Sequence, residues 1–190
     1  MISRTLIKAV MLFGAAVVGS AHFTEAAPFE QVCEGNGFEI QVSSDNASAG
    51  ANVRIVPKGL AKVNEVLEFQ SESPLSGVLF EDMNGDNIEE IVLVFRAAGS
   101  GSYGTVRAFS TNGAKSLTDI VIAEPSPSDL TGYMGHDEFQ IMENTFVRRF
   151  PVYNLGDSNA KPTGGMRQIQ YKLLPGEASW HLRIDRVVSF

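Results

Sequence analysis

Hydroxyl side chains in a glycine-rich segment are the clearest chemical feature of this chain. Residues 96–105 read RAAGSGSYGT, so Ser100, Ser102 and Tyr103 lie next to glycines. Glycine readily adopts positive φ and lets the backbone approach a partner closely. Serine and tyrosine hydroxyls both donate and accept hydrogen bonds. The segment is therefore predicted to be a thin exposed loop that presents hydroxyls to a narrow polar cleft. An ordinary hairpin connection, with Tyr103 packed on the sheet, is the alternative.

A second group of polar residues has the spacing of calcium ligands. Residues 82–90 read DMNGDNIEE, with side-chain oxygens on Asp82, Asn84, Asp86 and Glu90. Ca²⁺ binds six to eight oxygens, so one hypothesis is a calcium-dependent module that binds glycans or surfaces. An EF-hand is excluded because Leu93 occupies the place of its last ligand. We favour a tight turn in which these side chains accept hydrogen bonds from their own backbone, and we expect no metal or cofactor.

Signatures of enzymatic catalysis are sparse. His136 and His181 are the histidines that follow residue 27, which argues against a histidine-based metal site. The sequence has no GxSxG, P-loop, CxxC or HExxH motif. A pair of carboxylates that hydrolyses glycosides leaves no local signature, so a periplasmic hydrolase stays open as an alternative. We predict that the protein is not an enzyme.

Residues 1–27 have the organisation of a secretory signal peptide. Arg4 and Lys8 precede an apolar run that ends near Val18, and small residues follow it up to Ala26 and Ala27. The apolar run is much shorter than the ~20 residues of a membrane span. We predict cleavage after one of these two alanines, with Ser20 and Ala21 as alternative sites. The prediction is a periplasmic location and a mature domain of residues 28–190 that does not bind membranes.

The mature chain is acidic and carries one cysteine. Loss of residues 1–27 changes the formal charge from −7 to −8. This charge argues against a nucleic-acid ligand, and it favours either plain solubility or a basic partner. Cys33 cannot form an internal disulfide. We predict that it is a buried small hydrophobic residue, with an intermolecular bridge or a reactive thiol as alternatives.

Short segments of alternating apolar and polar residues predict an all-β fold. The expected strands lie around residues 38–42, 53–55, 67–69, 91–95, 106–109, 139–141, 146–150, 169–173 and 180–184. The continuous apolar run 91–95 predicts a central strand, and the glycine-rich loop joins it to the next strand. Only residues 113–122 could hold a short helix. We predict one antiparallel β-sandwich or flattened barrel of about eight or more strands.

Two long segments interrupt this alternation, at residues 124–137 and 154–165. Both are rich in Pro, Gly, Ser and Asp, and long loops in compact domains are often functional, with disorder as the alternative. The first contains Tyr133 and His136. We expect it to flank the glycine-rich loop, although a sheet-edge loop with an incidentally exposed tyrosine is an equal alternative.

The segments Ser100-Gly101-Ser102-Tyr103, Gly-Tyr-Met-Gly-His-Asp at 132–137 and Phe-Pro-Val-Tyr at 150–153 together resemble the periplasmic inhibitors of invertebrate-type (I-type) lysozyme. The resemblance covers essentially the whole mature chain. It implies a β-sandwich, allows for a homodimer, and names I-type lysozyme as the partner.

In that family, the loop that carries the Ser-Gly-x-Tyr motif enters the lysozyme active-site cleft. Ser100 and Tyr103 match its hydroxyl positions, Gly101 matches its glycine, and Ser102 takes its variable position. Tyr133 and His136 are expected to form a secondary contact loop. The implied mechanism is occlusion without turnover, with hydroxyls bonded to the two catalytic carboxylates of the lysozyme.

Overall fold

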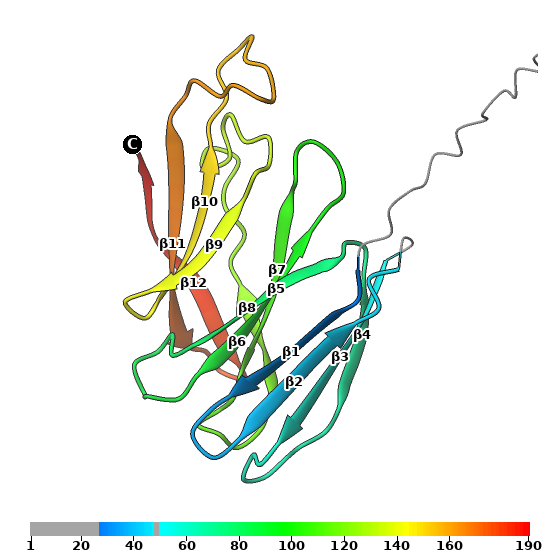
Figure 1. Ribbon diagram of the computed structural model, residues 1–190. Helices are drawn as coiled ribbons and strands as arrows, with labels where there is room; N and C mark the ends of the chain where they lie inside the picture. The colour runs from blue at the N-terminus through cyan, green and yellow to red at the C-terminus, as the bar shows by residue number, and fades with distance from the viewer. Residues whose placement is uncertain (1–26, 48–49) are drawn as a thin grey trace, which may run out of the picture.

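The fold is that of a computed structural model, which describes residues 27–47 and 50–190. These residues form twelve strands and no helix (Figure 1). The strands are β1 (Phe29–Glu34), β2 (Glu39–Ser44), β3 (Ala51–Lys58), β4 (Leu67–Ser71), β5 (Leu75–Glu81), β6 (Glu90–Arg96), β7 (Gly104–Ser110), β8 (Thr118–Ile122), β9 (Glu138–Met142), β10 (Thr145–Pro151), β11 (Met166–Pro175) and β12 (Trp180–Ser189). Over the same residues, no helix could cross a membrane. The segment predicted to be a signal peptide lies almost entirely outside this part of the chain.

The strands form two sheets. One has four strands in the order β1-β2-β3-β4, and the other has eight in the order β5-β6-β7-β8-β12-β11-β10-β9. The two end strands of the larger sheet, β5 and β9, touch each other, so this sheet curls into a nearly closed barrel. The four-stranded sheet packs beside β5, β6 and β7 (Figure 1). The predicted all-β fold is confirmed.

Two hydrophobic cores meet at β6. Ile91, Leu93 and Phe95 face the four-stranded sheet and pack against its buried residues. Val92 and Val94 point the other way, into the barrel. A strand buried on both faces needs a continuous apolar run rather than an alternating one. The prediction of a central strand at this place is therefore confirmed.

All nine predicted strands are present, and the structure adds β1, β5 and β8. The hairpin predicted around Glu143 and Asn144 joins β9 to β10, with φ of 49° and 58° at these two residues. Positive φ at both central residues is the signature of the turn that matches the twist of a hairpin. Cys33 is 4 % exposed and burial raises the pKa of its thiol, in agreement with the predicted buried hydrophobic role.

The helix considered for residues 113–122 is wrong. Asn112, Gly113 and Ala114 all have positive φ, which a right-handed helix does not allow. The Asn112 side-chain amide donates to Ser116 and Thr118, which closes a turn before β8 begins. β8 also departs from the antiparallel pattern, because it pairs in parallel with β12 at Val121 and Ile122.

Three loops meet at one end of the barrel, and this end carries the candidate site. They are residues 97–103 between β6 and β7, 123–137 between β8 and β9, and 152–165 between β10 and β11. Figure 1 shows all three at the end away from the β9–β10 turn. The predicted long loops are thus confirmed as loops, and the four-stranded sheet is on the side of the barrel rather than at this end.

Candidate functional site

Residues 100–103, which we call the hydroxyl loop, form an exposed turn at the tip of the β6–β7 hairpin. The Ser102 amide donates to the Gly99 carbonyl at 3.2 Å, and the Ala97 amide donates to the Tyr103 carbonyl at 2.8 Å. Ser100 is exposed and the Tyr103 side chain is 46 % exposed. None of the hydroxyls of Ser100, Ser102 and Tyr103 is hydrogen-bonded to another residue that the structure describes. The loop therefore presents hydroxyls with free hydrogen-bonding capacity.

The backbone of the hydroxyl loop is held by both neighbouring loops. The His136 amide donates to the Gly101 carbonyl at 2.7 Å. On the other side, Asn159 Nδ2 donates to the Ser100 carbonyl at 2.7 Å. The His136 Nε2 and Asn159 Oδ1 atoms are 3.3 Å apart, which links the two flanking loops to each other. Three segments that are far apart in the sequence thus fix the position of one turn.

The predicted residue Tyr133 lies directly behind Tyr103. Their rings meet edge to face with 5.6 Å between centroids, an arrangement that aromatic pairs favour. The Tyr133 hydroxyl points inward and donates to the carboxylate of Asp137. Burial, followed by this hydrogen bond and the charge of Asp137, raises the pKa of Tyr133. The structure therefore brings Tyr133 and His136 beside the hydroxyl loop, with Tyr133 as a partly buried support for Tyr103.

Asp137 is the anchor beneath this end of the barrel. Its side chain is fully buried, and one of its oxygens accepts from the Gly104 amide at 2.8 Å and from the Tyr133 hydroxyl. The other oxygen accepts from Arg148 Nε at 2.7 Å. Because Gly104 begins β7, immediately after Tyr103, these bonds fix the base of the hydroxyl loop.

Arg148 completes the anchor from within the barrel. Burial alone would lower the pKa of its guanidinium, but the charge and hydrogen bond of Asp137 outweigh burial and leave the pKa raised. The guanidinium carbon lies 4.9 Å from the centre of the Tyr133 ring, within the range of a cation–π contact. Arg148 thus holds both Asp137 and the ring that supports Tyr103.

Asp137, Arg148 and Asn159 are not among the site residues that the sequence predicts. One signal was present for Arg148, because Phe146, Arg148 and Phe150 lie on the same face of one strand and both phenylalanines are fully buried. A charged residue on the inward face of a strand needs a buried partner of opposite charge. The sequence offers no comparable signal for Asn159, which lies in an irregular loop.

The segment of residues 82–90 forms the tight turn that we favoured over a calcium site. Asp82 accepts hydrogen bonds from the amides of Asn84, Gly85 and Asn87. Gly85 has φ of 81°, in the left-handed region. In the described part of the chain, no group of three or more His, Cys, Asp or Glu residues is placed to hold a metal ion. Asp82 and Asn84 thus accept hydrogen bonds from the turn's own backbone, as the tight-turn interpretation predicts.

Glu90, beneath this turn, predicts a specific pH dependence of stability. Burial, with smaller contributions from the charges of Asp86 and Asp82, raises the pKa of Glu90 from 4.5 to about 7. Between these values the folded state binds more protons than the unfolded state. The stability that Glu90 contributes is therefore fully present below pH 4.5 and is lost as the pH rises through 7.

We expect the unfolding free energy of the Glu90→Gln variant not to show this decrease with rising pH, because glutamine does not titrate. Between pH 5 and pH 8, the unaltered protein should lose up to about 3 kcal/mol of unfolding free energy relative to the variant. Urea unfolding of both proteins at each pH measures the difference, in which contributions from all other groups cancel. Parallel pH profiles would show that Glu90 titrates at its ordinary pKa.

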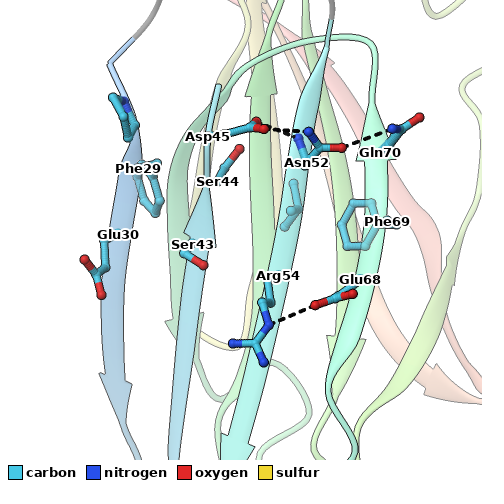
Figure 2. A pocket seen from close by; sticks show the side chains of 12 residues that line it. Phe29, Glu30, Ser43, Ser44, Asp45, Asn52, Arg54, Glu68, Phe69 and Gln70 are labelled. Carbon is cyan, nitrogen blue, oxygen red and sulfur yellow. Dashed lines mark hydrogen bonds and ion pairs between the residues drawn. The ribbon is translucent and has the colours of Figure 1, made fainter. Parts of the chain in front are cut away.

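A large open hollow of about 810 Å³ lies on the four-stranded sheet (Figure 2). Five of its polar side chains are paired with one another: Arg54 contacts Glu68 at 2.9 Å, and Asn52 bridges Asp45 and Gln70. Figure 2 shows these pairs extending across β2, β3 and β4. Because Arg54 and Glu68 are exposed and pair with each other, and no predicted site residue lines the hollow, we place the candidate site at the three-loop end of the barrel.

Comparison with known proteins gives one family. Residues 39–130 match the model of the family described as periplasmic lysozyme inhibitor of I-type lysozyme. This span contains the hydroxyl loop and ends before Tyr133. No curated protein matches the chain. The family description also confirms the periplasmic location that the N-terminal segment predicts.

Among solved structures, the crystal structure of Aeromonas hydrophila PliI in complex with Meretrix lusoria lysozyme is similar to this chain. It has 20 % sequence identity and a TM-score of 0.41, and the match covers 49 % of this chain and 82 % of that chain. Through residues 39–130, just under half of its length, the chain is similar to the family of periplasmic lysozyme inhibitors of I-type lysozyme, a family of inhibitor proteins.

Proposed function

We propose that the protein inhibits I-type lysozyme by inserting the hydroxyl loop into the active-site cleft of the enzyme. The observation that carries this proposal is the set of unpaired hydroxyls on Ser100, Ser102 and Tyr103, presented by a backbone that two other loops hold in place. Ser100 and Tyr103 would hydrogen-bond to the two catalytic carboxylates that a lysozyme needs on either side of the glycosidic bond. A protein loop offers no glycosidic bond to cleave, so the site is occluded.

The fixed backbone explains how so small a loop can bind tightly. A flexible loop would lose conformational entropy when it binds, whereas a loop ordered beforehand avoids most of that cost. A hydrogen bond to a charged group contributes about 1.5–3 kcal/mol. Tyr103 adds burial of an exposed aromatic ring, which is typical of interface hot spots. Tyr103 is therefore expected to be the main anchor of the complex.

A titration of three lysozyme classes tests the proposal. Purified mature protein is added to an I-type, a chicken-type and a goose-type lysozyme in a cell-wall lysis assay. We expect near-stoichiometric inhibition of the I-type enzyme. A folded protein that inhibits none of the three would contradict the proposal. Homodimer formation, which the resemblance allows, stays a prediction.

The position of the hydroxyl loop depends on Gly135, which gives a second test. A Cβ atom at residue 135 would overlap the carbonyl oxygen of Gly101, a backbone atom that cannot yield without moving the loop. We expect Gly135→Ala to weaken inhibition at least about tenfold, equivalent to about 1.4 kcal/mol. Inhibition constants and thermal melts of the variant provide the measurement.

Gly156→Ala is the matched control. Gly156 has φ of 93°, close to the 91° of Gly135, but no heavy atom lies within 4 Å of a Cβ added there. Both variants therefore carry similar backbone strain, and only Gly135→Ala displaces the hydroxyl loop. Equal inhibition by the two variants would show that this displacement does not affect lysozyme binding.

A further inference from the structure

A cavity opens into the barrel beside the hydroxyl loop because the wall between β7 and β8 is incomplete. These two strands pair only over residues 108–110 and 118–120. Beyond this point β8 pairs with β12 at Val121 and Ile122. Residues 104–107 of β7 therefore have β6 on one side and no strand partner on the other within the described chain. A cavity of about 340 Å³ lies behind this gap.

The cavity has the composition of a small-ligand site. Five aromatic rings line it, those of Tyr103, Tyr133, Phe139, Phe146 and Tyr171, together with the guanidinium of Arg148. Ligand sites are typically concave, mostly apolar and equipped with a few polar groups, at volumes of about 300–1,000 Å³. A barrel of eight strands has room for one small ligand at its mouth. The cavity is therefore at the small end of this range.

The Arg148 guanidinium lines the cavity and has five N–H donors, more than its bond to Asp137 uses. Its Nε donates to Asp137 at 2.7 Å. The guanidinium also lies close enough to the hydroxyls of Tyr133 and Tyr171 to oppose the rise of both pKa values. The Arg148 side chain is 15 % exposed and is one of the residues that line the cavity. Tyr171 lies nearby: burial raises its pKa to about 12, against the opposing effect of Arg148.

The Asp137 carboxylate is already hydrogen-bonded without the Nη atoms of Arg148. Its carboxylate already accepts from the Gly104 amide, the Tyr133 hydroxyl and Arg148 Nε. An arginine can bind a further carboxylate through its terminal nitrogens in a charge-assisted, planar arrangement. The other charged residue of the lining, Glu124, is exposed at the rim, where water and salt screen its charge.

We propose that this cavity binds a small apolar carboxylate, with the apolar body among the aromatic rings and the carboxylate on the Nη atoms of Arg148. Apolar contact with the rings and a charge-assisted bond to Arg148 together favour such a ligand over a neutral or cationic one. The inference is independent of lysozyme binding, because Arg148 and most of the rings lie inside the barrel and not on the hydroxyl loop.

Phenylacetate and its neutral analogue phenylacetamide test the proposal without any change to the protein. We expect phenylacetate to bind with a dissociation constant below about 1 mM, and phenylacetamide to bind at least about tenfold more weakly. Calorimetry gives the affinities, and NMR shift changes locate the ligand on the cavity residues. Equal binding of both compounds, shifts confined to other surfaces, or no binding of phenylacetate at 10 mM would each overturn the proposal.

A cavity-filling variant provides the test on the protein side. Val106 lines the cavity, and Val106→Phe should reduce phenylacetate binding at least about tenfold by occupying its space. Val121 is 50 % exposed, so Val121→Phe is a matched control that should bind phenylacetate normally. Thermal melts of both variants confirm folding. Normal binding by a folded Val106→Phe variant would place the ligand elsewhere and overturn the assignment.

Discussion

Replacement of Tyr103 by alanine is expected to weaken the inhibition of I-type lysozyme by at least about thirtyfold, equivalent to about 2 kcal/mol. The substitution removes a hydroxyl with no described partner and a ring that is 46 % exposed in the free protein. It should leave the fold intact, because Tyr133 and Asp137 keep their contacts with Phe150 and Arg148. Inhibition constants from the lysis assay, together with thermal melts, measure both effects.

Met142→Ala is the control for this prediction. The Met142 side chain is 47 % exposed, which matches Tyr103, and it lies at the β9–β10 turn, away from the three loops. Loss of an exposed side chain outside the interface should leave inhibition within about twofold. If Tyr103→Ala inhibits as well as Met142→Ala does, the hydroxyl loop is not the part of the protein that enters the cleft.

Local patterns in the sequence were sufficient to predict most of the strands. Alternation along residues 38–42 and 139–141 reflects strands with one buried face, and the continuous run 91–95 reflects burial on both faces of β6. These patterns depend only on which faces of a strand are buried, so a single segment carries the information. The same holds for the β9–β10 turn, where Glu143 and Asn144 adopt the positive φ that the hairpin requires.

Strand partners could not be predicted in the same way. β8 pairs in parallel with β12, about sixty residues later in the chain, and nothing in its five residues specifies that partner. The turn before β8 also resembles the start of a helix in composition. The side chain of Asn112 decides between the two structures by bonding to Ser116 and Thr118, a contact that composition does not reveal.

In the candidate site, too, local features could be predicted from the sequence and long-range contacts could not. The hydroxyl loop could be predicted because its glycines and hydroxyls are contiguous. The residues that hold the loop in place could not be predicted, because their contacts are distant in the sequence. Asp137 bonds to Gly104 across 33 residues, and Asn159 bonds to Ser100 across 59 residues. Only Arg148, on the inward face of its strand, indicates from the sequence that a buried acidic partner exists. The sequence does not indicate which acidic residue that partner is. Contacts of this kind become visible only when the three loops are brought together.

The buried pair of Asp137 and Arg148 should have the largest effect on stability of any single contact at the site. The Arg148 side chain is only 15 % exposed, so Asp137→Asn leaves its charge buried without a charged partner. Breaking a buried ion pair from one side typically costs about 3–5 kcal/mol. We therefore expect Asp137→Asn to lower the unfolding free energy by this amount in urea titrations. Inhibition should weaken as well, because the base of the hydroxyl loop loses its anchor.

Asp119→Asn makes the same chemical change in an exposed pair and isolates the effect of burial. Asp119 accepts from Arg107 Nε at 2.8 Å, as Asp137 does from Arg148 Nε, and also from Arg107 Nη2 at 3.2 Å. The side chains of Asp119 and Arg107 are 58 % and 39 % exposed. An exposed pair contributes about 1 kcal/mol or less, since water solvates both charges when the bond is broken. Asp119→Asn should therefore unfold within about 1 kcal/mol of the unaltered protein and inhibit normally. Equal stability losses in the two variants would mean that water reaches Asp137 in solution, and that the hydroxyl loop is held by its backbone contacts with His136 and Asn159 alone.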